Sequence, residues 1–163
     1  MDAFGNELNE LLVNTYRSVY KIEELMLRDL SKEQLSIGEM HAIECVGKGG
    51  PDGRTVTEIS QELEITPPSV TAMIKRLEKK GFVTKQKGVH DGRQVHIHLT
   101  EDGRKADVAH RYFHRKMVNA VRQCITPEEM PMLLRSVTGI NEFFRQKLEK
   151  LEGKVPEKEG KYL

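Results

Sequence analysis

The sequence has few cysteines that could cross-link a small fold and no apolar segment long enough to span a membrane. Its 163 residues include two cysteines and no tryptophan. Cys45 and Cys124 lie far apart and form no Cys-x-x-Cys unit, which argues against a disulfide scaffold or a cysteine-ligated zinc finger. We expect both to be reduced core cysteines. Because no apolar run approaches the roughly 20 residues that span a bilayer, and Met1–Gly5 lacks a secretory-signal start, we expect a cytoplasmic protein with no membrane partner.

The motifs of common hydrolases and nucleotide-binding enzymes are also missing. The sequence has no His-Glu-x-x-His, no Gly-x-Ser-x-Gly and no phosphate-binding loop. The segment from His110 to His114 lacks the intervening glutamate of the zinc proteases. We therefore expect a protein that is not an enzyme and that requires no cofactor.

Charge is small in total but uneven along the chain. The net charge is +1, and 37% hydrophobic with 31% charged residues is an ordinary composition for a soluble domain. Residues 1–53 hold 5 basic and 10 acidic residues, whereas residues 67–94 hold 7 basic and 2 acidic ones. Because DNA responds to the local face rather than to the total charge, the second segment is a candidate DNA-binding surface. The alternative is a solvated helix face followed by a hairpin.

Capping signals divide the middle of the chain into short helices. Capping boxes at residues 36–39 and 55–58 open two of them. Thr66 caps a third helix with Pro67 at its first position, where a missing N–H costs nothing, and Gly81 marks its end. The last two helices have the spacing of a helix-turn-helix.

The helix that follows Thr66 has one apolar and one polar face. Val70, Ile74 and Leu77 recur at i, i+4 and i+7, so we expect them to face the core. The residues turned outward are small and polar first and basic later, namely Ser69, Thr71, Ala72, Lys75 and Arg76. This order suits a recognition helix that enters the major groove of DNA by its N-terminal end.

The stretch around Asp91-Gly92-Arg93 is typical of a DNA-binding wing, a charged hairpin that returns into a helix. Val95, Ile97 and Leu99 alternate with His96 and His98, so we expect the apolar residues to pack inward and the histidines to face water. The DNA-binding candidates of the hairpin are Lys85, Lys87, Asp91 and Arg93. Arg93 fits a narrow minor groove, with its guanidinium held by Asp91; an ordinary surface ion pair is the alternative.

Long helices flank the predicted DNA-binding segment, residues 36–100, which we call the reader. We expect one at residues 4–30 and two within residues 101–151, the first capped by Thr100 and the second opened by the segment 126–129. The last helix carries an apolar stripe that is too large for an isolated helix, formed by Met132, Leu133, Val137, Ile140, Phe144 and Leu148. We predict that the flanking helices form a homodimer interface, with packing inside one chain as the alternative.

These elements define the predicted architecture. The fold class is mainly α, a winged helix-turn-helix at residues 36–100 with a two-stranded wing, embedded between N- and C-terminal dimerisation helices. Residues 1–152 form one protomer. Residues 153–163 are charged, contain glycine and proline, and are expected to be a disordered tail.

The helix order, the helix-turn-helix, the Asp-x-Arg wing and the terminal dimer helices resemble the MarR family of winged-helix regulators over nearly the whole chain. Ile37–Ile43 with Val46–Lys48, His96–Thr100 and His110–Val118 look like the FabT group, repressors of bacterial fatty-acid synthesis genes. The resemblance implies a homodimer that binds an AT-rich inverted repeat of double-stranded DNA. It also implies a corepressor, a long-chain acyl group on acyl carrier protein. Gly49–Gly53 and the longer charged tail depart from that group.

Two histidines allow a different effector. His110 and His114 stand at i and i+4, the spacing at which two imidazoles bind one metal ion. His41 on a neighbouring helix and Glu23 on the first helix are candidate further ligands. Such a set resembles the zinc site of the MarR-family zinc-uptake repressors and would make the protein a zinc-responsive repressor. The alternatives are histidines that form hydrogen bonds between reader and dimer helices, or that contact an organic ligand.

A corepressor between reader and dimer helices would set the spacing of the two recognition helices. Apolar candidates for that crevice are Leu25, Met26, Ile43, Phe113 and Met117. Plain core packing is the alternative for each of them. Two further alternatives concern the function of the whole chain. It could be a MarR regulator that a small ligand releases from DNA, or a winged helix used only for protein interaction.

Overall fold

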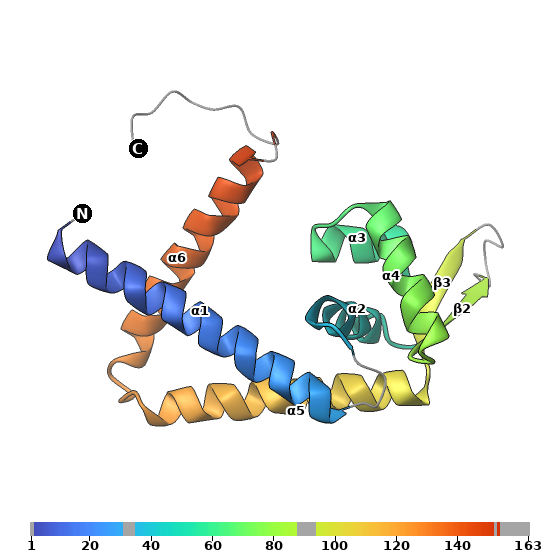
Figure 1. Cartoon of the computed structure of the whole chain (residues 1–163), viewed down its shortest axis with the longest axis horizontal. Helices are drawn as coiled ribbons and strands as arrows, with labels where there is room; N and C mark the ends of the chain where they lie inside the picture. Colours follow the sequence, from blue (N-terminus) through green and yellow to red (C-terminus); the bar gives the residue numbers. More distant parts are fainter. Residues whose placement is uncertain (1, 31–34, 88–93, 152, 154–163) are drawn as a thin grey trace. The chain divides into compact units, whose positions relative to one another are not determined.

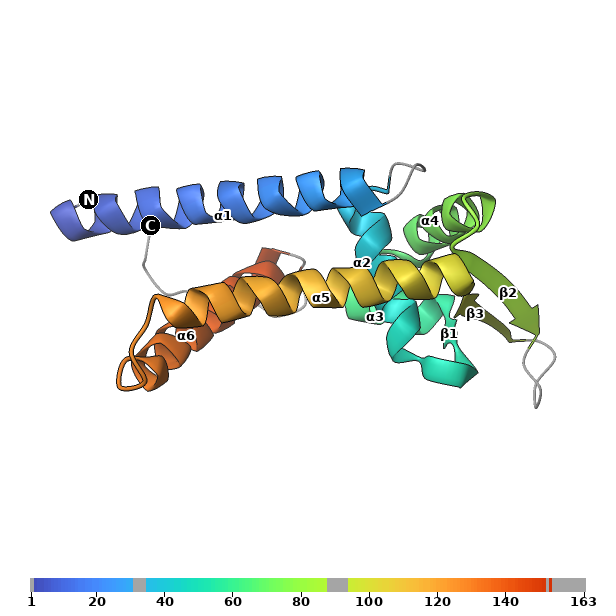
Figure 2. The same ribbon diagram turned by 90° about the horizontal axis from the view of Figure 1, so that it is seen from below.

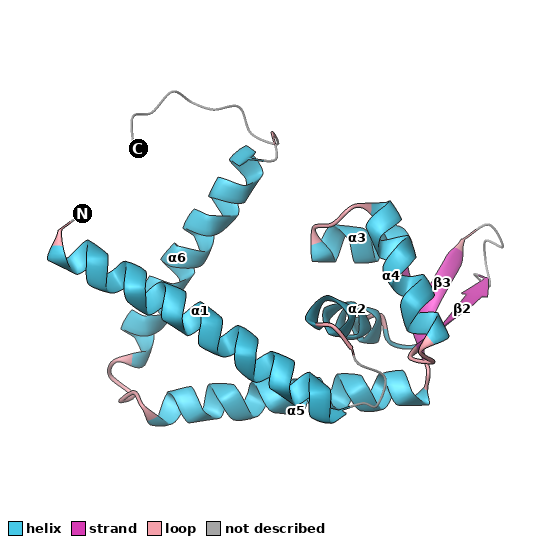
Figure 3. Ribbon diagram, in the orientation of Figure 1, coloured by secondary structure: helices cyan, strands magenta, loops and turns pink. Residues whose placement is uncertain are grey.

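The structure is a computed structural model that describes residues 2–30, 35–87, 94–151 and 153 (Figure 1). The chain divides into two compact units, Met1–Arg115 and Lys116–Leu163. The first unit holds α1 (Ala3–Leu30), α2 (Ile37–Lys48), the short 3-10 helix η1 (Gly50–Asp52), β1 (Arg54–Thr55), α3 (Val56–Leu63), α4 (Pro67–Lys79), β2 (Val83–Lys87) and β3 (Val95–Leu99). α5 (Glu101–Gln123) begins in the first unit and ends in the second, which also holds α6 (Met130–Leu151). The described residues are mainly helical, and the strands are confined to the wing region (Figure 3).

Local capping explains where the reader helices begin. The Ser36 hydroxyl accepts the Glu39 backbone N–H, and the Glu39 carboxylate accepts the Ser36 N–H at 3.0 Å, so α2 starts with a complete capping box. Thr55 and Glu58 do the same for α3. Thr66 caps α4, which carries proline in its first turn. These three starts lie where the sequence predicted them, because each depends on groups three residues apart.

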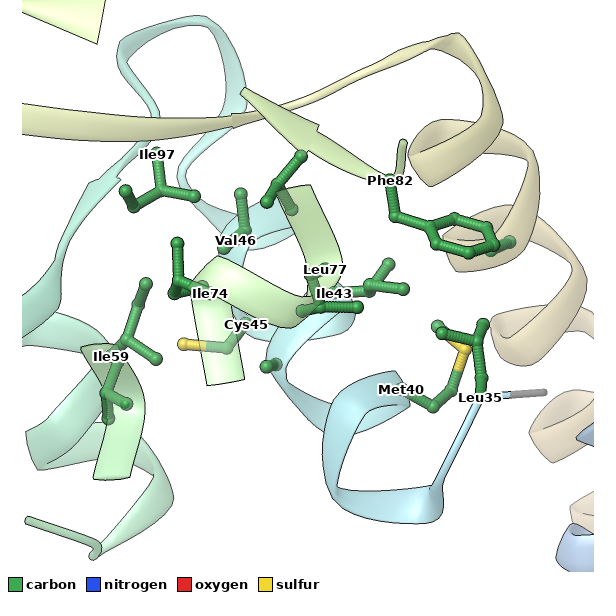
Figure 4. Close-up of a cluster of buried hydrophobic side chains, with 14 of the residues drawn as sticks. Leu35, Met40, Ile43, Cys45, Val46, Ile59, Ile74, Leu77, Phe82 and Ile97 are labelled. Atoms are coloured by element: carbon green, nitrogen blue, oxygen red, sulfur yellow. The ribbon is translucent and has the colours of Figure 1, made fainter. Parts of the chain in front are cut away.

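One hydrophobic core holds the reader together, and Figure 4 shows it in close-up. Val70, Ile74 and Leu77 of α4 are fully buried, as their spacing predicted. They pack with buried residues of α2, α3, β3 and the turn before β2, among them Met40, Ile43, Val46, Ile59, Phe82 and Ile97. The α4 face opposite these residues is therefore the one left for solvent or a ligand.

The sheet has one strand more than the sequence predicted. Its order is β1-β3-β2, all antiparallel, with Arg54 opposite Ile97 and Lys85 opposite the same residue on the other side (Figure 2). The two-stranded wing thus gains a short edge strand, β1, which pairs with β3 directly before α3. A strand of two residues is too short for a recognisable sequence pattern.

The pattern predicted for β3 is only partly right. Ile97 is fully buried and Leu99 half-buried, but Val95 is 43% exposed near the outer end of the wing. His96 and His98 are half-buried rather than facing water, and η1 lies against this side of the strand, with His96 Nδ1 2.9 Å from the Asp52 carbonyl oxygen. A covered sheet face overrides simple alternation.

The two cysteines differ from each other. Cys45 is buried, and burial raises the pKa of its thiol to about 11, which makes it an unreactive core residue as predicted. Cys124 is exposed, so the prediction that both belong to the core was wrong for this residue. It lies directly after α5, where an amphipathic pattern no longer decides which way a side chain points.

The long helices begin and end close to their predicted bounds. α6 starts at Met130 rather than at Thr126, because residues 127–129 form a turn in which the Glu129 carboxylate accepts the Thr126 N–H. None of the helices that the structure describes is both long and apolar enough to cross a bilayer. Of the segment predicted to be a disordered tail, residues 154–163 lie outside the described residues.

Candidate nucleic-acid interface and histidine cluster

The exposed face of α4 carries all five side chains that the sequence assigned to DNA contact on this helix. Ser69, Thr71, Ala72, Lys75 and Arg76 are exposed. The Thr71 hydroxyl donates to the Pro67 carbonyl at 2.9 Å, and the Ser69 hydroxyl lies 2.9 Å from that of Thr66. Hydroxyl and methyl groups at the beginning of the helix and cations near its end form a continuous polar-to-basic surface.

The basic residues near this face differ in how firmly they are held. Lys85 on β2 pairs with Glu78 of α4 at 2.6 Å, which ties the wing to the helix. Lys87 is exposed at the end of β2. Asp91 and Arg93, the predicted wing-tip contacts, lie outside the described residues.

A cluster of a carboxylate and histidines lies within the first unit. Glu23 Oε1 of α1 is 3.1 Å from His41 Nε2 of α2 and 3.1 Å from His110 Nε2 of α5. One ligand atom from each of these three residues lies within 4.8 Å of the other two. His114 Nε2 is 3.1 Å from His110 Nε2 and extends the cluster through it. All four predicted residues are thus joined, with Glu23, His41 and His110 at the centre.

Burial makes the cluster chemically unusual. His110 is fully buried and Glu23 nearly so, whereas the His41 side chain is 45% exposed and opens the cluster to solvent. Burial lowers the pKa of His114, and the neighbouring His110 lowers it further. A neutral imidazole is the form that binds a metal ion. This environment therefore favours the neutral, metal-binding form of His114 over its protonated form.

Glu44 is a member of this cluster that the sequence analysis missed. Its Oε2 lies 3.5 Å from His110 Nδ1, a buried nitrogen that has no hydrogen-bond partner among the described residues. Glu44 stands three residues after His41 on α2, so its helical spacing was the signal available.

The proposed crevice residues are in different environments. Ile43 is fully buried in the reader core, and Met26 packs against that core from α1. Leu25 is 46% exposed. Phe113 is half-buried, with its ring centroid 5.3 Å from that of His114. Met117 is half-buried and belongs to the second unit.

Comparison with known proteins identifies the class. The model of the MarR family matches residues 35–95, the segment that contains the helix-turn-helix. The crystal structure of Streptococcus pneumoniae FabT in complex with DNA is 34% identical, covers 86% of this chain and 97% of that chain, and superposes with a TM-score of 0.79. The Bacillus subtilis HTH-type transcriptional repressor MdtR is 29% identical over 103 residues, 63% of this chain and 65% of that protein. The B. subtilis HTH-type transcriptional regulator YhjH is 29% identical over 96 residues, 59% of this chain and 54% of that protein.

The chain belongs to the MarR family of winged-helix transcriptional regulators. Among the solved structures it is similar to FabT over nearly the full length of that chain, whereas it spans between about half and two thirds of the two curated relatives. The prediction of a winged-helix regulator rather than an enzyme is confirmed at the level of the family.

Proposed function

We propose that this protein is a homodimeric MarR-type repressor that binds duplex DNA through α4 and controls genes of fatty-acid synthesis. The main support for DNA binding comes from α4. This helix buries Val70, Ile74 and Leu77 on one side and exposes polar and basic residues on the other. The FabT structure that resembles this chain was solved with DNA. The assignment to fatty-acid synthesis rests on the likeness to the FabT group.

The arrangement suggests how the duplex is read. Ser69, Thr71 and Ala72 would meet base edges in the major groove, while Lys75 contacts phosphates. Lys85 and Lys87 of β2 would follow the adjacent backbone, and Arg93 would enter the minor groove with its guanidinium held by Asp91. Two copies with recognition helices roughly 34 Å apart fit an inverted repeat, AT-rich in this proposal.

Exposed apolar side chains support dimerisation. On α1, Phe4, Leu11 and Tyr16 are each more than half exposed. α6 has an apolar stripe, and none of its described residues is buried. Large apolar areas of this kind on a soluble chain mark interaction surfaces, and a second copy is the partner that pairs with both helices.

The effector in this proposal is a long-chain acyl group carried by acyl carrier protein. A crevice of the first unit, beside Leu25, Met26 and Phe113, would receive the acyl chain. A differential affinity of about 1.4 kcal/mol for the DNA-competent dimer shifts its occupancy tenfold, so modest contacts suffice.

Fluorescence anisotropy on labelled promoter DNA of fatty-acid synthesis genes tests this proposal. The titration is run in chelator, with and without long-chain acyl carrier protein, and with the unacylated carrier as control. We expect the acylated carrier to tighten DNA binding and the unacylated one to leave it unchanged. Tight DNA binding that neither carrier alters would reject the lipid effector and keep the DNA-binding assignment.

A second candidate function, zinc-responsive repression, is favoured by the geometry of the histidine cluster. A tetrahedral zinc ion with bonds of about 2.0–2.1 Å holds its ligand atoms about 3.3 Å apart. The 3.1 Å separations around Glu23 Oε1 and between His110 and His114 are close to that value. Glu44 Oε2 lies 3.5 Å from His110 Nδ1 and would orient this histidine in a zinc site by accepting a hydrogen bond from that nitrogen.

Competition with a chromophoric chelator measures zinc binding directly. His41→Gln is the variant of choice because His41 is exposed and its replacement should leave the core intact. We expect the wild type to compete for zinc and His41→Gln to do so far more weakly, with His96→Gln as the matched histidine control. Equal competition by both variants and the wild type would exclude His41 as a ligand, and no competition by the wild type would reject the zinc site.

A further inference from the structure

Glu39 connects α2 to the recognition helix through a buried carboxylate. The residue is 3% exposed, and besides the Ser36 N–H its oxygens accept from two cations of the α4 segment. Lys80 Nζ lies 2.8 Å from Oε2, and Arg76 Nε lies 3.3 Å from Oε1. The capping bond is local, but the two cations come from 37 and 41 residues further along the chain.

The two cations are held in different ways. The Lys80 side chain is 24% exposed and sits close to the carboxylate, so it provides the charge that a buried anion needs. The Arg76 side chain is 57% exposed and meets Glu39 through Nε. A guanidinium has five donors in a rigid plane, so a bond at Nε fixes the plane and leaves the terminal N–H groups for another acceptor.

The position of Arg76 connects this contact to DNA binding. Arg76 follows Lys75 on the exposed face of α4 and lies one turn beyond Ala72. We propose that Glu39 is a positioning residue for DNA binding, which holds Arg76 by Nε so that its terminal N–H groups meet a DNA phosphate or base edge. This inference rests on the proposed function, in which α4 enters the DNA groove. Orienting a long side chain before binding reduces the rotamer entropy lost in the complex.

A purely structural role for Glu39 makes a different prediction. In that case Glu39 would hold α2 against α4, and its loss would weaken the fold whether or not Arg76 is present. If Glu39 acts through Arg76, removing the carboxylate changes DNA affinity only while Arg76 is there to be oriented. A double-mutant cycle on DNA affinity separates the two roles.

The variants are Glu39→Gln, Arg76→Gln and the double variant in the full chain. Glutamine at position 39 can still accept the Ser36 N–H, so the start of α2 is preserved. Ser36→Ala is the matched control, because it removes the cap hydroxyl and leaves both ion pairs of Glu39 in place. DNA affinity is measured by anisotropy on a duplex selected by the wild type from a random library, with urea unfolding of each variant in parallel.

We expect each single variant to bind the selected duplex roughly tenfold more weakly, which is within the range of couplings between residues in contact. The double variant should be no weaker than Arg76→Gln, and Ser36→Ala should lose stability but keep its affinity. Additive losses in the double variant, or an Arg76→Gln affinity equal to that of the wild type, would overturn the positioning role and leave DNA binding by α4 in place. A wild type that selects no duplex would instead refute the proposed function.

Discussion

Lys75 is the residue that tests most simply whether α4 meets the DNA backbone. Its side chain is exposed on the polar face of α4. Each cation that contacts a phosphate releases counterions, so Lys75→Gln should weaken binding to all duplexes alike and reduce the slope of log affinity against log salt by about 1. Anisotropy titrations over a series of salt concentrations give both values.

Lys105→Gln is the control for this charge removal. Lys105 is equally an exposed lysine but lies on α5, paired with Glu101 at 2.8 Å. We expect its replacement to leave the salt slope unchanged. If the two variants changed affinity and slope equally, the effect would come from net charge, and the assignment of Lys75 to a phosphate contact would be wrong.

Glu39 also makes folding stability dependent on pH. Burial by itself would raise the pKa of Glu39, but hydrogen bonds and charge from Lys80, the Ser36 N–H and Arg76 outweigh it and leave that pKa below its usual value. A carboxyl whose pKa is lower in the folded state stabilises the fold above its unfolded pKa, and this stability is lost as the pH falls through the folded pKa.

Glu39→Gln should therefore be less stable than the wild type near neutral pH, and the difference should shrink as the pH falls from about 5 towards 3. Urea unfolding at a series of pH values gives the free energy of unfolding for both proteins. Ser36→Ala controls for the capping box, since its deficit should be nearly independent of pH. A Glu39→Gln deficit that stayed constant over the same range would show that the carboxylate charge contributes nothing.

At the scale of elements, α5 is fixed to the reader by a close approach of backbones. Gly103 lies in the first turn of α5, where its N–H is accepted by the Thr100 hydroxyl at 3.1 Å. A Cβ at this position would stand 2.1 Å from the carbonyl oxygen of Phe82, a backbone atom that cannot turn aside. The Thr100 N–H also donates to that oxygen, so a shift would cost this bond as well.

Gly103→Ala should consequently lower the free energy of unfolding by about 1–3 kcal/mol, the usual cost of overpacking. Gly38→Ala is the control, because Gly38 also lies in the first turn of a helix but its Cβ would meet Met73 Cε at an ordinary 3.8 Å. We expect that variant to be as stable as the wild type or slightly more so. Thermal unfolding gives the melting temperatures of Gly103→Ala and Gly38→Ala. Equal melting temperatures for the two variants would show that α5 can move away from Phe82 without loss of stability.

The helices and strands also differ in how well they could be predicted from the sequence. Helix starts and the buried face of α4 were predictable, because they depend on residues three to seven positions apart. The pairing of Arg54 with Ile97 and the contact of Glu39 with Arg76 were not, since nothing local links residues about 40 positions apart. Glu39 was recognised as a cap, but its second set of partners depends on how α2 packs against α4.

In the candidate site, too, local patterns were predictable and contacts between distant residues were harder to predict. The exposed residues of α4 were predicted from periodicity alone. The histidine cluster was largely predictable: i and i+4 spacing identified His110 and His114, and the expected packing of the helices added His41 and Glu23. Glu44 was missed although it lies on the same helix as His41, because a lone carboxylate among many gives no distinct pattern.

For the whole molecule, the exposed apolar stripe of α6 predicts an interface with a second copy. Phe144 lies in the C-terminal half of this stripe and is 51% exposed, and no described residue of α6 is buried. If the stripe is the interface between two copies, the symmetry of a dimer places the substitution in both partners. Truncating a buried phenylalanine costs about 3–5 kcal/mol, so Phe144→Glu should raise the dimer dissociation constant by at least about a hundredfold.

Sedimentation equilibrium over a range of protein concentrations measures that change, and DNA titrations show its consequence. A monomer contacts one half-site, so we expect Phe144→Glu to lose its preference for an inverted repeat over a single half-site while the reader stays folded. Gln146→Glu adds the same charge at an exposed position two residues later, on the opposite side of the helix from the stripe, and should remain dimeric. A Phe144→Glu protein that kept the wild-type mass but unfolded more easily would place the stripe inside one chain, as the sequence alone also allowed.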